Sequence, residues 1–400
     1  MSDGGTNAMS DGGPTATNDA SAATETTATV DDSDRTIDEI DPTTQSEKGQ
    51  LPLSVVIIAE NEEDNIGDCI ESVFAACRSV SAFEVILVDS ASTDRTVEIA
   101  REYPVTVLRI PDEHTVSCGA GRFVGDQVAR GELVLHVDGD MTLTDDWLPA
   151  AIAYLQDHEE TVGVEGWLDD AEADTIIEVN KIGGVTLYDA AALAAVGGFD
   201  PFLRGYEDID VGFQLTTIGK RLVRLPAVSA IHDDEDGISE PLRRWRQGYF
   251  VALGQTVRKH LDSPASMWLL AQRQRFEIAL LAWAVAGVVS LVSLSLFGVW
   301  LLGSAVGFAL IVNERGATGA VDFVTRKALG IAGIASGVRQ PPRPAAEYPL
   351  AAIEVVAAGR VLNGSPLEKP AASATAGSST ATPASTTTTT SASESAEQPE

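Results

Sequence analysis

Short apolar runs alternate with amphipathic segments over the first part of the chain. Four runs are rich in β-branched residues, as is typical of strands buried on both faces; they cover residues 53–59, 83–88, 105–110 and 132–137. From Ile66 to Cys77, apolar residues recur at the spacing of an amphipathic helix. Further helices are expected at residues 93–102, 119–129 and about 144–156. This alternation predicts an α/β fold, with a mostly parallel sheet flanked by helices.

The pattern is less regular after Val162. We expect strands at residues 185–188, 222–225 and 228–232, and helices at 189–196 and 207–218. Gly197 and Gly219 stand where a glycine often ends a helix. A further helix is expected to carry the basic residues Arg243, Arg244 and Arg246.

A long apolar stretch runs from Ile278 to Val312 without a charge. A membrane-spanning helix needs about 20 apolar residues. The stretch is either one long tilted span or a tight hairpin of two short spans, and we favour the hairpin, with Gly298 as a residue that helps to break it. Arginines precede and follow the stretch, which fits a hairpin with both ends, and the catalytic domain, on the cytoplasmic side of the cell membrane. The alternative is a buried helix pair.

The two ends of the chain have a different composition from its middle. Residues 1–50 are rich in Asp, Ser, Thr and Gly, and residues 364–400 in Ser, Thr, Ala and Pro. Such segments bury too little apolar surface to offset their ordering entropy, so we expect disorder in both. We expect a catalytic domain at 51–262 and a membrane-associated region at 263–363, with its transmembrane segment or segments at about 278–312.

Charge narrows the function classes. The formal net charge is −32, from 59 acidic against 27 basic residues. A nucleic-acid partner is not expected, because such proteins present a basic face. An acidic, hydrated surface resembles that of cytosolic proteins of salt-loving archaea. The three cysteines lack the spacing of a disulfide framework or a zinc site, and Cys69 and Cys77 fall on the apolar face of a helix.

Polar residues follow three of the predicted strands. Asn61, Asp89 and Asp138 lie just past strand ends, and ligands bind at the carboxyl ends of strands in parallel sheets. Asp138-Gly139-Asp140 places two carboxylates on one turn, where they suit a hard cation such as Mg²⁺ or Mn²⁺. An Asp-Gly sequence alone is more often an ordinary turn, but the neighbouring polar residues favour a site.

Three further groups are candidates from the residues alone. A carboxylate of Glu207-Asp208 would serve as a general base, or would stabilise a helix N-terminus. His232 would bind a metal, or would be structural. Arg243 and Arg244 would bind phosphate, or would lie on a solvated helix face. There is no nucleophile elbow, phosphate-binding P-loop or dinucleotide fingerprint at a strand–helix turn.

Taken together, these residues resemble a family-two glycosyltransferase with the GT-A fold, from about Leu53 to Trp245. Five segments occur in the family's order. They are Ser54-Val-Val-Ile-Ile-Ala-Glu-Asn-Glu62, Val88-Asp-Ser-Ala-Ser-Thr-Asp94, Gly121-Arg-Phe-Val-Gly125, Gly131-Glu-Leu-Val-Leu-His-Val-Asp-Gly-Asp140, and Gly197-Gly-Phe-Asp-Pro201 followed by Glu207-Asp208.

The resemblance implies a role for each matched residue. Asp89 would bind the nucleotide base, Asp138 the ribose and Asp140 the metal, with His232 as a further metal or diphosphate contact. Asp208 would be the catalytic base. Asn61, Glu62 and Arg122 would complete the donor site, and Arg243 and Arg244 would bind phosphate.

Departures from the family pattern are also informative. Phe123 stands where Asn is usual, and Glu60 replaces an uncharged residue. Pro241 stands where processive synthases carry Gln before Arg-Trp, so a processive polymerase is not expected.

The resulting hypothesis is an inverting, metal-dependent transfer of a sugar from a nucleotide-sugar donor to a lipid-linked glycan, lipid phosphate or polysaccharide acceptor, in cell-surface glycan assembly. Two alternatives remain open. One is a nucleotidyltransferase that makes nucleotide sugars, although the loop after the first strand is acidic rather than basic. The other is a non-catalytic, membrane-tethered protein that binds glycans.

Overall fold

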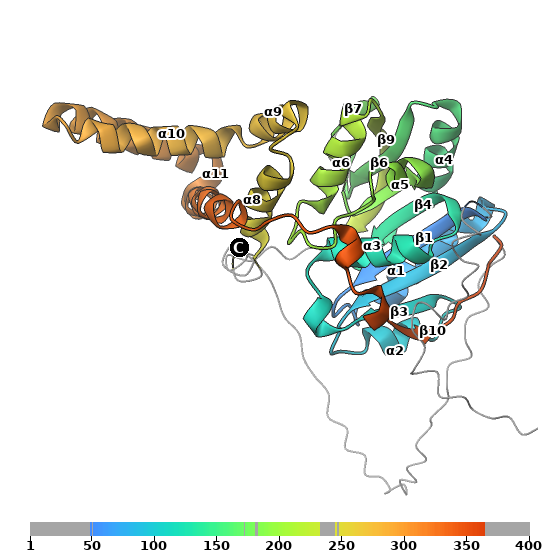
Figure 1. Cartoon of the computed structure of the whole chain (residues 1–400). Coiled ribbons are helices and arrows are strands. Elements are labelled where there is room, and N and C mark those ends of the chain that lie inside the picture. Colours follow the sequence, from blue (N-terminus) through green and yellow to red (C-terminus); the bar gives the residue numbers. More distant parts are fainter. Residues whose placement is uncertain are drawn as a thin grey trace, which may run out of the picture.

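The computed structural model describes residues 49, 51–171, 173–180, 183–232, 245 and 248–364. Its centre is one sheet in the order β10-β3-β2-β1-β4-β8-β6-β9-β5, with β7 paired to β9 (Figure 1). The strands are β1 Leu51–Ala59, β2 Phe83–Ser90, β3 Thr106–Ile110, β4 Gly131–Asp138, β5 Met141–Leu143, β6 Thr161–Leu168, β7 Ile177–Val179, β8 Val185–Asp189, β9 Arg221–His232 and β10 Glu354–Ala357.

The first four strands form the parallel half of the sheet. β1 lies between β2 and β4 and pairs with both in parallel, and β2 pairs in parallel with β3. Leu53 to Ile57 are buried without a break, and so is all of β2. A continuous apolar run of this kind is stable only where helices cover both faces, which confirms the sequence interpretation for this half.

The other half of the sheet is mixed, which corrects the expectation of a mostly parallel sheet. β8 runs antiparallel to both β4 and β6, and β5 and β7 run antiparallel to β9. β6 and β9 are parallel. The two strands expected at 222–225 and 228–232 are one strand, β9. Its alternation is interrupted where its register with β6 shifts, and this explains the two separate patterns.

Helices cover both faces of the sheet. One face packs against α1 Ile66–Ala76, α2 Thr96–Ala100 and α4 Trp147–Asp157. The other packs against α3 Cys118–Val128, α5 Ala190–Ala195 and α6 Glu207–Thr217. Short 3-10 helices lie at Cys77–Ser79, Asp112–His114, Ala345–Glu347 and Leu350–Ala352. Gly197 and Gly219 have positive φ after α5 and α6, as expected.

Glycines set the distance between α3 and β1. A Cβ at Gly125 would lie 2.3 Å from a methyl carbon of Val56, and one at Gly121 would lie 2.9 Å from Ile58. The two glycines are one helical turn apart, so both face the sheet. This close approach brings Arg122, which directly follows Gly121, near the end of β4.

The C-terminal helices extend away from the sheet (Figure 1). They are α8 Tyr249–Lys259, α9 Pro264–Arg273, α10 Arg275–Ser290 and α11 Leu294–Gly337. α11 bends at Gly316, whose φ of 75° and ψ of 171° are not helical. The first limb of α11 packs along α10, with the rings of Trp283 and Trp300 stacked at 6.1 Å. The chain turns between Ser290 and Leu294, not at Gly298, which lies inside α11.

Among the described residues, α11 alone is long and apolar enough to cross a membrane. The most apolar window of this helix is not buried in the protein. α10 has 16 residues, or about 24 Å at 1.5 Å per residue, which is short of a hydrocarbon core of about 30 Å. A spanning hairpin therefore stays a prediction.

The chain after α11 returns to the central sheet. Tyr348 packs edge-on against Phe123 of α3, and β10 pairs with the edge strand β3. Residues 345–364 therefore do not belong with the apolar helices, although 263–363 was expected to be one membrane-associated region. The segment is short and rich in small residues, so its periodicity is too weak to identify a strand.

Candidate active site

Asp89 and Asp138 lie on either side of β1. Asp89 is opposite Ala59 in the β1–β2 pair, and Asp138 is opposite Ile58 in the β1–β4 pair. The two carboxylates are thus placed one residue apart along β1, at the carboxyl end of the parallel half. Ligands bind at this edge of such sheets, so the rim inferred from sequence exists in the structure.

Asp89 is fully buried and only partly satisfied. Its Oδ2 accepts a hydrogen bond from the Ser92 amide at 3.1 Å and lies 3.5 Å from Nε of Arg109. Among the described residues its Oδ1 has no hydrogen-bond partner. Burial raises the pKa of Asp89, although Ser92 and Arg109 favour the charged form. A buried acceptor without a donor is costly, and a ligand N–H group would satisfy it.

Asn61 closes the loop above Asp89. Its φ of 58° is left-handed. Its side-chain Oδ1 accepts hydrogen bonds from the backbone amide and the hydroxyl of Thr93. Its backbone amide donates to Ser92 Oγ. These bonds give Asn61 a structural role in shaping the rim, and a direct donor contact stays a prediction.

Glu62 is half-buried beside the aspartate turn. Burial raises the pKa of Glu62, and the nearby charges of Asp140, Asp94 and Asp138 raise it further. Several carboxylates close together in a partly buried place repel one another. This part of the rim therefore favours a bound cation.

The Asp138-Gly139-Asp140 turn is held tightly by backbone contacts. The Gly139 amide donates to the Ile58 carbonyl at 2.8 Å. A Cβ on Gly139 would lie 3.0 Å from that carbonyl oxygen. A Cβ on Gly184 would lie 2.3 Å from Asp138 Oδ2, and the Gly184 carbonyl accepts from the Asp138 amide. Sequence reasoning missed Gly184, for which the Gly183-Gly184 pair was the available signal.

Arg122 links the two halves of the site. Its guanidinium lies 2.6 Å from Asp138 Oδ1 and 2.7 Å from Glu207 Oε1, and its side chain is 6% exposed. Burial raises the pKa of Glu207, even against the neighbouring Arg122. One buried cation between two carboxylates fixes the position of α6 relative to β4. Arg122 thus orients Asp138, and the predicted direct contact with the donor stays a prediction.

Asp140 and His232 meet across two strands. Met141 of β5 is opposite His232 of β9, and His232 Nε2 lies 3.1 Å from Asp140 Oδ2. Asp140 Oδ1 is buried and has no partner among the described residues. Within the described chain, no group of three or more His, Cys, Asp or Glu side chains is arranged to hold a metal. Two protein ligands still fit Mg²⁺ or Mn²⁺, because Mg²⁺ usually keeps waters and uses substrate phosphates.

Glu207 and Asp208 begin α6. The preceding residue, Tyr206, has a φ of 64°, and the first turn of the helix carries Glu207, Asp208 and Asp210. Acidic residues at a helix N-terminus interact favourably with its dipole. Glu207 is buried in an ion pair with Arg122, whereas Asp208 is only half-buried. The general base predicted from sequence therefore occupies the accessible position of the pair.

A buried ion-pair network behind α6 was not anticipated. Asp210 accepts from Lys259 at 2.7 Å and from His260 Nε2 at 2.7 Å, and Lys259 also donates to Asp200 at 2.8 Å. Burial alone would raise the pKa of Asp210, but its bonds to His260 and Lys259 lower it. No spacing rule joins residues that are about 50 positions apart, so no sequence pattern predicts this network.

The remaining prediction concerns the arginines. Arg243 and Arg244 lie outside the described residues. Their assignment to phosphate binding therefore stays a prediction.

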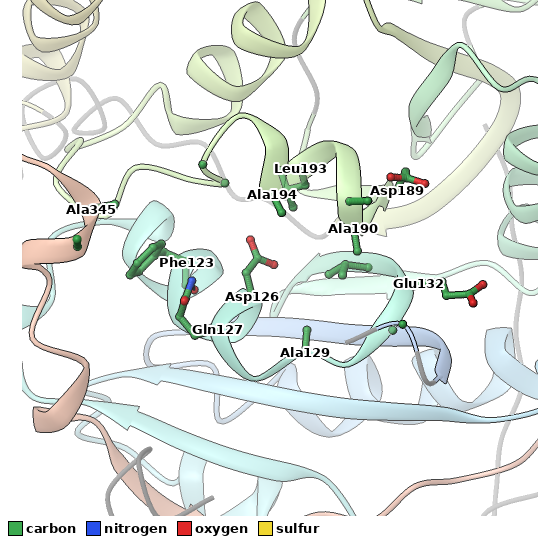
Figure 2. Close-up of a pocket in the computed structure, with 17 residues that line it drawn as sticks. Phe123, Asp126, Gln127, Ala129, Glu132, Asp189, Ala190, Leu193, Ala194 and Ala345 are labelled. Carbon is green, nitrogen blue, oxygen red and sulfur yellow. Dashed lines mark hydrogen bonds between the residues drawn. The ribbon is translucent and has the colours of Figure 1, made fainter. Parts of the chain in front are cut away.

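A cavity of about 720 Å³ lies away from this rim. It opens between α3 and α5 and includes Gly131 and Glu132, at the start of β4. Figure 2 shows Asp126 pointing from α3 into it. Asp138 stands at the opposite end of β4, so the cavity is separate from the site.

Comparison with known proteins finds a family match in the part of the chain that includes Asp89, Asp138 and Asp140. Residues 54–175 match the family model described as Glycosyl transferase family 2. An undecaprenyl-phosphate 4-deoxy-4-formamido-L-arabinose transferase of Pectobacterium carotovorum is 31% identical over 120 residues, which cover 28% of this chain and 36% of the relative. A dodecaprenyl-phosphate galacturonate synthase of Rhizobium johnstonii is 31% identical over 154 residues, covering 35% and 45%.

The chain thus spans less than half the length of these curated relatives. Among solved structures, the mannosyltransferase PcManGT from Pyrobaculum calidifontis, in complex with GDP-Man and Mn²⁺, superposes with a TM-score of 0.51 at 20% identity. The match covers 72% of this chain and 87% of that one. This likeness confirms the GT-A-like fold. The matched segment, residues 54–175, is similar in sequence to glycosyltransferase family 2.

Proposed function

We propose that this protein transfers a sugar from a nucleotide-sugar donor to a lipid-linked acceptor. The observation that carries the proposal is the rim formed by Asp89, Asp138 and Asp140, which Arg122 joins to Glu207-Asp208. One site thus combines carboxylate oxygens that would accept hydrogen bonds from a nucleotide, a place for a cation, and a carboxylate that would act on the sugar acceptor. The family-two domain supports the reaction class.

The donor would lie along the carboxyl edge of the parallel half. Asp89 Oδ1 is a buried acceptor without a partner among the described residues, and it suits an N–H group of a nucleotide base. Asp138, held by Arg122, would accept from ribose hydroxyls. Asn61 and Glu62 shape the loop at the edge of this site.

Asp140 and His232 would hold a divalent cation, either Mg²⁺ or Mn²⁺. A cation there would neutralise the charge that develops on the departing diphosphate. Oδ1 of Asp140, which has no partner within the described part of the chain, and the adjacent imidazole of His232 are the groups that fit it. Arg243 and Arg244 are proposed as additional phosphate contacts.

Asp208 would act on the acceptor. It would remove a proton from an acceptor hydroxyl in a single inverting displacement, provided that it lies within hydrogen-bond reach. A lipid phosphate is already ionised, and with that acceptor Asp208 would position the nucleophile instead. The names of the two relatives specify polyprenyl phosphates, which supports a lipid phosphate here.

The apolar helices would place this reaction at a membrane. The first limb of α11 ends beside Arg315, and α10 begins at Arg275. Trp268 of α9 and Trp283 of α10 are exposed, and Trp is enriched at membrane interfaces. We propose membrane attachment through this region, with the catalytic domain on the cytoplasmic side.

The decisive experiment screens donors with the full chain reconstituted in vesicles that contain a polyprenyl phosphate. UDP- and GDP-sugars are tested with Mn²⁺, with Mg²⁺ and with EDTA, and both nucleoside-diphosphate release and the glycolipid product are measured. We expect one donor class to give product only with metal. Diphosphate release without glycolipid would exclude the lipid acceptor, and no release from any donor would contradict the transferase.

Localisation is tested separately by membrane fractionation with an alkaline wash. We expect the full chain to remain in the membrane fraction. Complete recovery in the supernatant would contradict membrane attachment but would leave the transferase proposal intact.

A further inference from the structure

Tyr206 stands immediately before the catalytic carboxylates in a strained backbone conformation. Its φ of 64° is in the left-handed region, which is rare for an aromatic residue and persists only where the surroundings hold it. Gly205 precedes it with a φ of 150°, and a Cβ there would lie 2.8 Å from the ring of Tyr249. The turn before Glu207 is thus pressed against the start of α8.

The Tyr206 side chain is anchored in the C-terminal helices. Its ring lies 5.9 Å from that of Tyr249 and joins a buried cluster of apolar side chains, Ile209, Phe213, Leu253 and Leu270. Its hydroxyl is within hydrogen-bond distance of the Gln274 amide, at 3.2 Å. Gln274 lies where α9 ends and α10 begins, and it is 7% exposed.

Gln274 continues into a chain of buried polar groups. With its Nε2 directed at Glu277 (3.1 and 3.2 Å), its Oε1 accepts from the Tyr206 hydroxyl. Glu277 of α10 is 7% exposed and accepts from Lys327 of α11 at 2.6 Å. Buried polar groups are stable only when each has a partner. The Tyr206 hydroxyl is therefore one end of a series of hydrogen bonds that continues through α10 to Lys327 of α11, and it is the end next to the catalytic carboxylates.

We infer that Tyr206 is a positioning residue for the acceptor side of the reaction. Through Gln274, Glu277 and Lys327 it holds the turn that presents Glu207 to Arg122 and Asp208 to the acceptor. The geometry of the catalytic turn then depends on the packing of α10 and α11. The inference rests on the proposed function only for its kinetic effect, because the coupling itself is structural.

The kinetic test uses the full chain in vesicles. Tyr206→Phe removes the hydroxyl and keeps the ring, and Gln274→Met removes the amide at similar volume. Each is expected to lower kcat for glycolipid formation about tenfold, the effect of one hydrogen bond, with the donor KM unchanged. Because both variants break one chain, the double variant is expected to match the single ones. Multiplicative effects, or an unchanged kcat in Tyr206→Phe, would overturn the inference.

Tyr103→Phe is the matched control. Its hydroxyl also makes a 3.2 Å hydrogen bond, to Glu71, on the other side of the molecule and away from α6. We expect kcat in this variant to equal that of the unmodified protein. A tenfold loss here would show that removing a phenol hydroxyl acts through general stability, and would overturn the positioning role.

A second measurement does not need activity. Hydrogen exchange of amides 207–211 is expected to be faster in both Tyr206→Phe and Gln274→Met, and unchanged in Tyr103→Phe. Unchanged exchange in the first two variants refutes the coupling. If the unmodified protein transfers no sugar but exchange responds as expected, the proposed function fails and the structural coupling stands.

Discussion

The two halves of the sheet hold their site residues in different ways. In the parallel half, Asp89 and Asp138 are placed by strand register on either side of β1. In the mixed half, Asp208 lies on a helix whose position depends on buried charges, from Arg122 on one side and from Lys259 and His260 on the other. Backbone pairing thus arranges the residues proposed to bind the donor, whereas side-chain ion pairs arrange the residue proposed to act on the acceptor.

The difference has a physical consequence. Strand register is set by many backbone hydrogen bonds and a packed core, so one side chain at a strand end can change with little effect on the fold. A helix held by buried ion pairs is more sensitive, because removal of one partner leaves an uncompensated charge. Substitutions at the strand ends should therefore alter activity alone, and those in the ion pairs that hold α6 should alter activity and stability together.

The largest effect is expected for Asp140→Ala. Loss of a group that stabilises developing charge typically costs about 100- to 1,000-fold in rate, and we expect diphosphate release to fall by about that factor. The thermal unfolding midpoint should stay close to that of the unmodified protein, since the carboxylate is only partly satisfied. Asp157→Ala, at an exposed site at the end of α4, is the control for activity and stability. Full activity in Asp140→Ala would remove the cation site.

The second effect concerns the link between the halves. Arg122→Met leaves the partly buried carboxylate of Asp138 and the buried carboxylate of Glu207 without the cation between them, and we expect a loss of about 3–5 kcal/mol in the free energy of unfolding. The rate of sugar transfer should fall as well, because α6 is no longer held in its position relative to β4. Arg122→Lys keeps one charge and should recover part of both losses. Denaturant unfolding and glycolipid formation measure the two effects. If Arg122→Met were inactive but fully stable, the ion pairs would not be what holds α6.

The third prediction concerns pH. The pKa of Asp210 is lowered in the fold, so its ionised form stabilises the protein above its ordinary value of 3.8, and this contribution disappears as the pH falls through the lowered pKa. Asp210→Asn should be less stable by about 2 kcal/mol at neutral pH, and the difference should shrink below about pH 4. Thermal unfolding from pH 7 to pH 3 measures it. A difference that stays constant with pH would mean that the network does not depend on the charge of Asp210.

The smallest effect is expected at a surface pair in the C-terminal helices. Asp322 and Arg326 are one turn apart on α11 and are about one-third exposed. Exposed pairs of this kind contribute about 0.3–0.5 kcal/mol. Asp322→Ala should therefore change the free energy of unfolding by no more than this, whereas Glu277→Ala, which removes the buried partner of Lys327, should cost several times as much. Equal losses would mean that burial does not distinguish the two pairs.

Much of the fold could be predicted from local patterns. The buried runs from Leu53 and Phe83 identify parallel strands, and Ile66 to Cys77 identifies α1, because apolar periodicity reflects which face each element buries. The strands in the mixed half are less distinct. β5 and β7 have three residues each, and β10 has four. Strands this short show no recognisable alternation of apolar and polar residues.

The sequence by itself determined that Asp89, Asp138 and Asp140 follow buried strands, and that a long apolar stretch precedes Glu314. Both features depend only on residues that are close together in the chain, so a local pattern is enough to reveal them. Only the tertiary structure decided that Arg122 joins Asp138 to Glu207, that His232 meets Asp140, and that Tyr206 is anchored to Gln274. Such contacts join residues far apart in the chain, and they depend on register and helix packing, which no local pattern records.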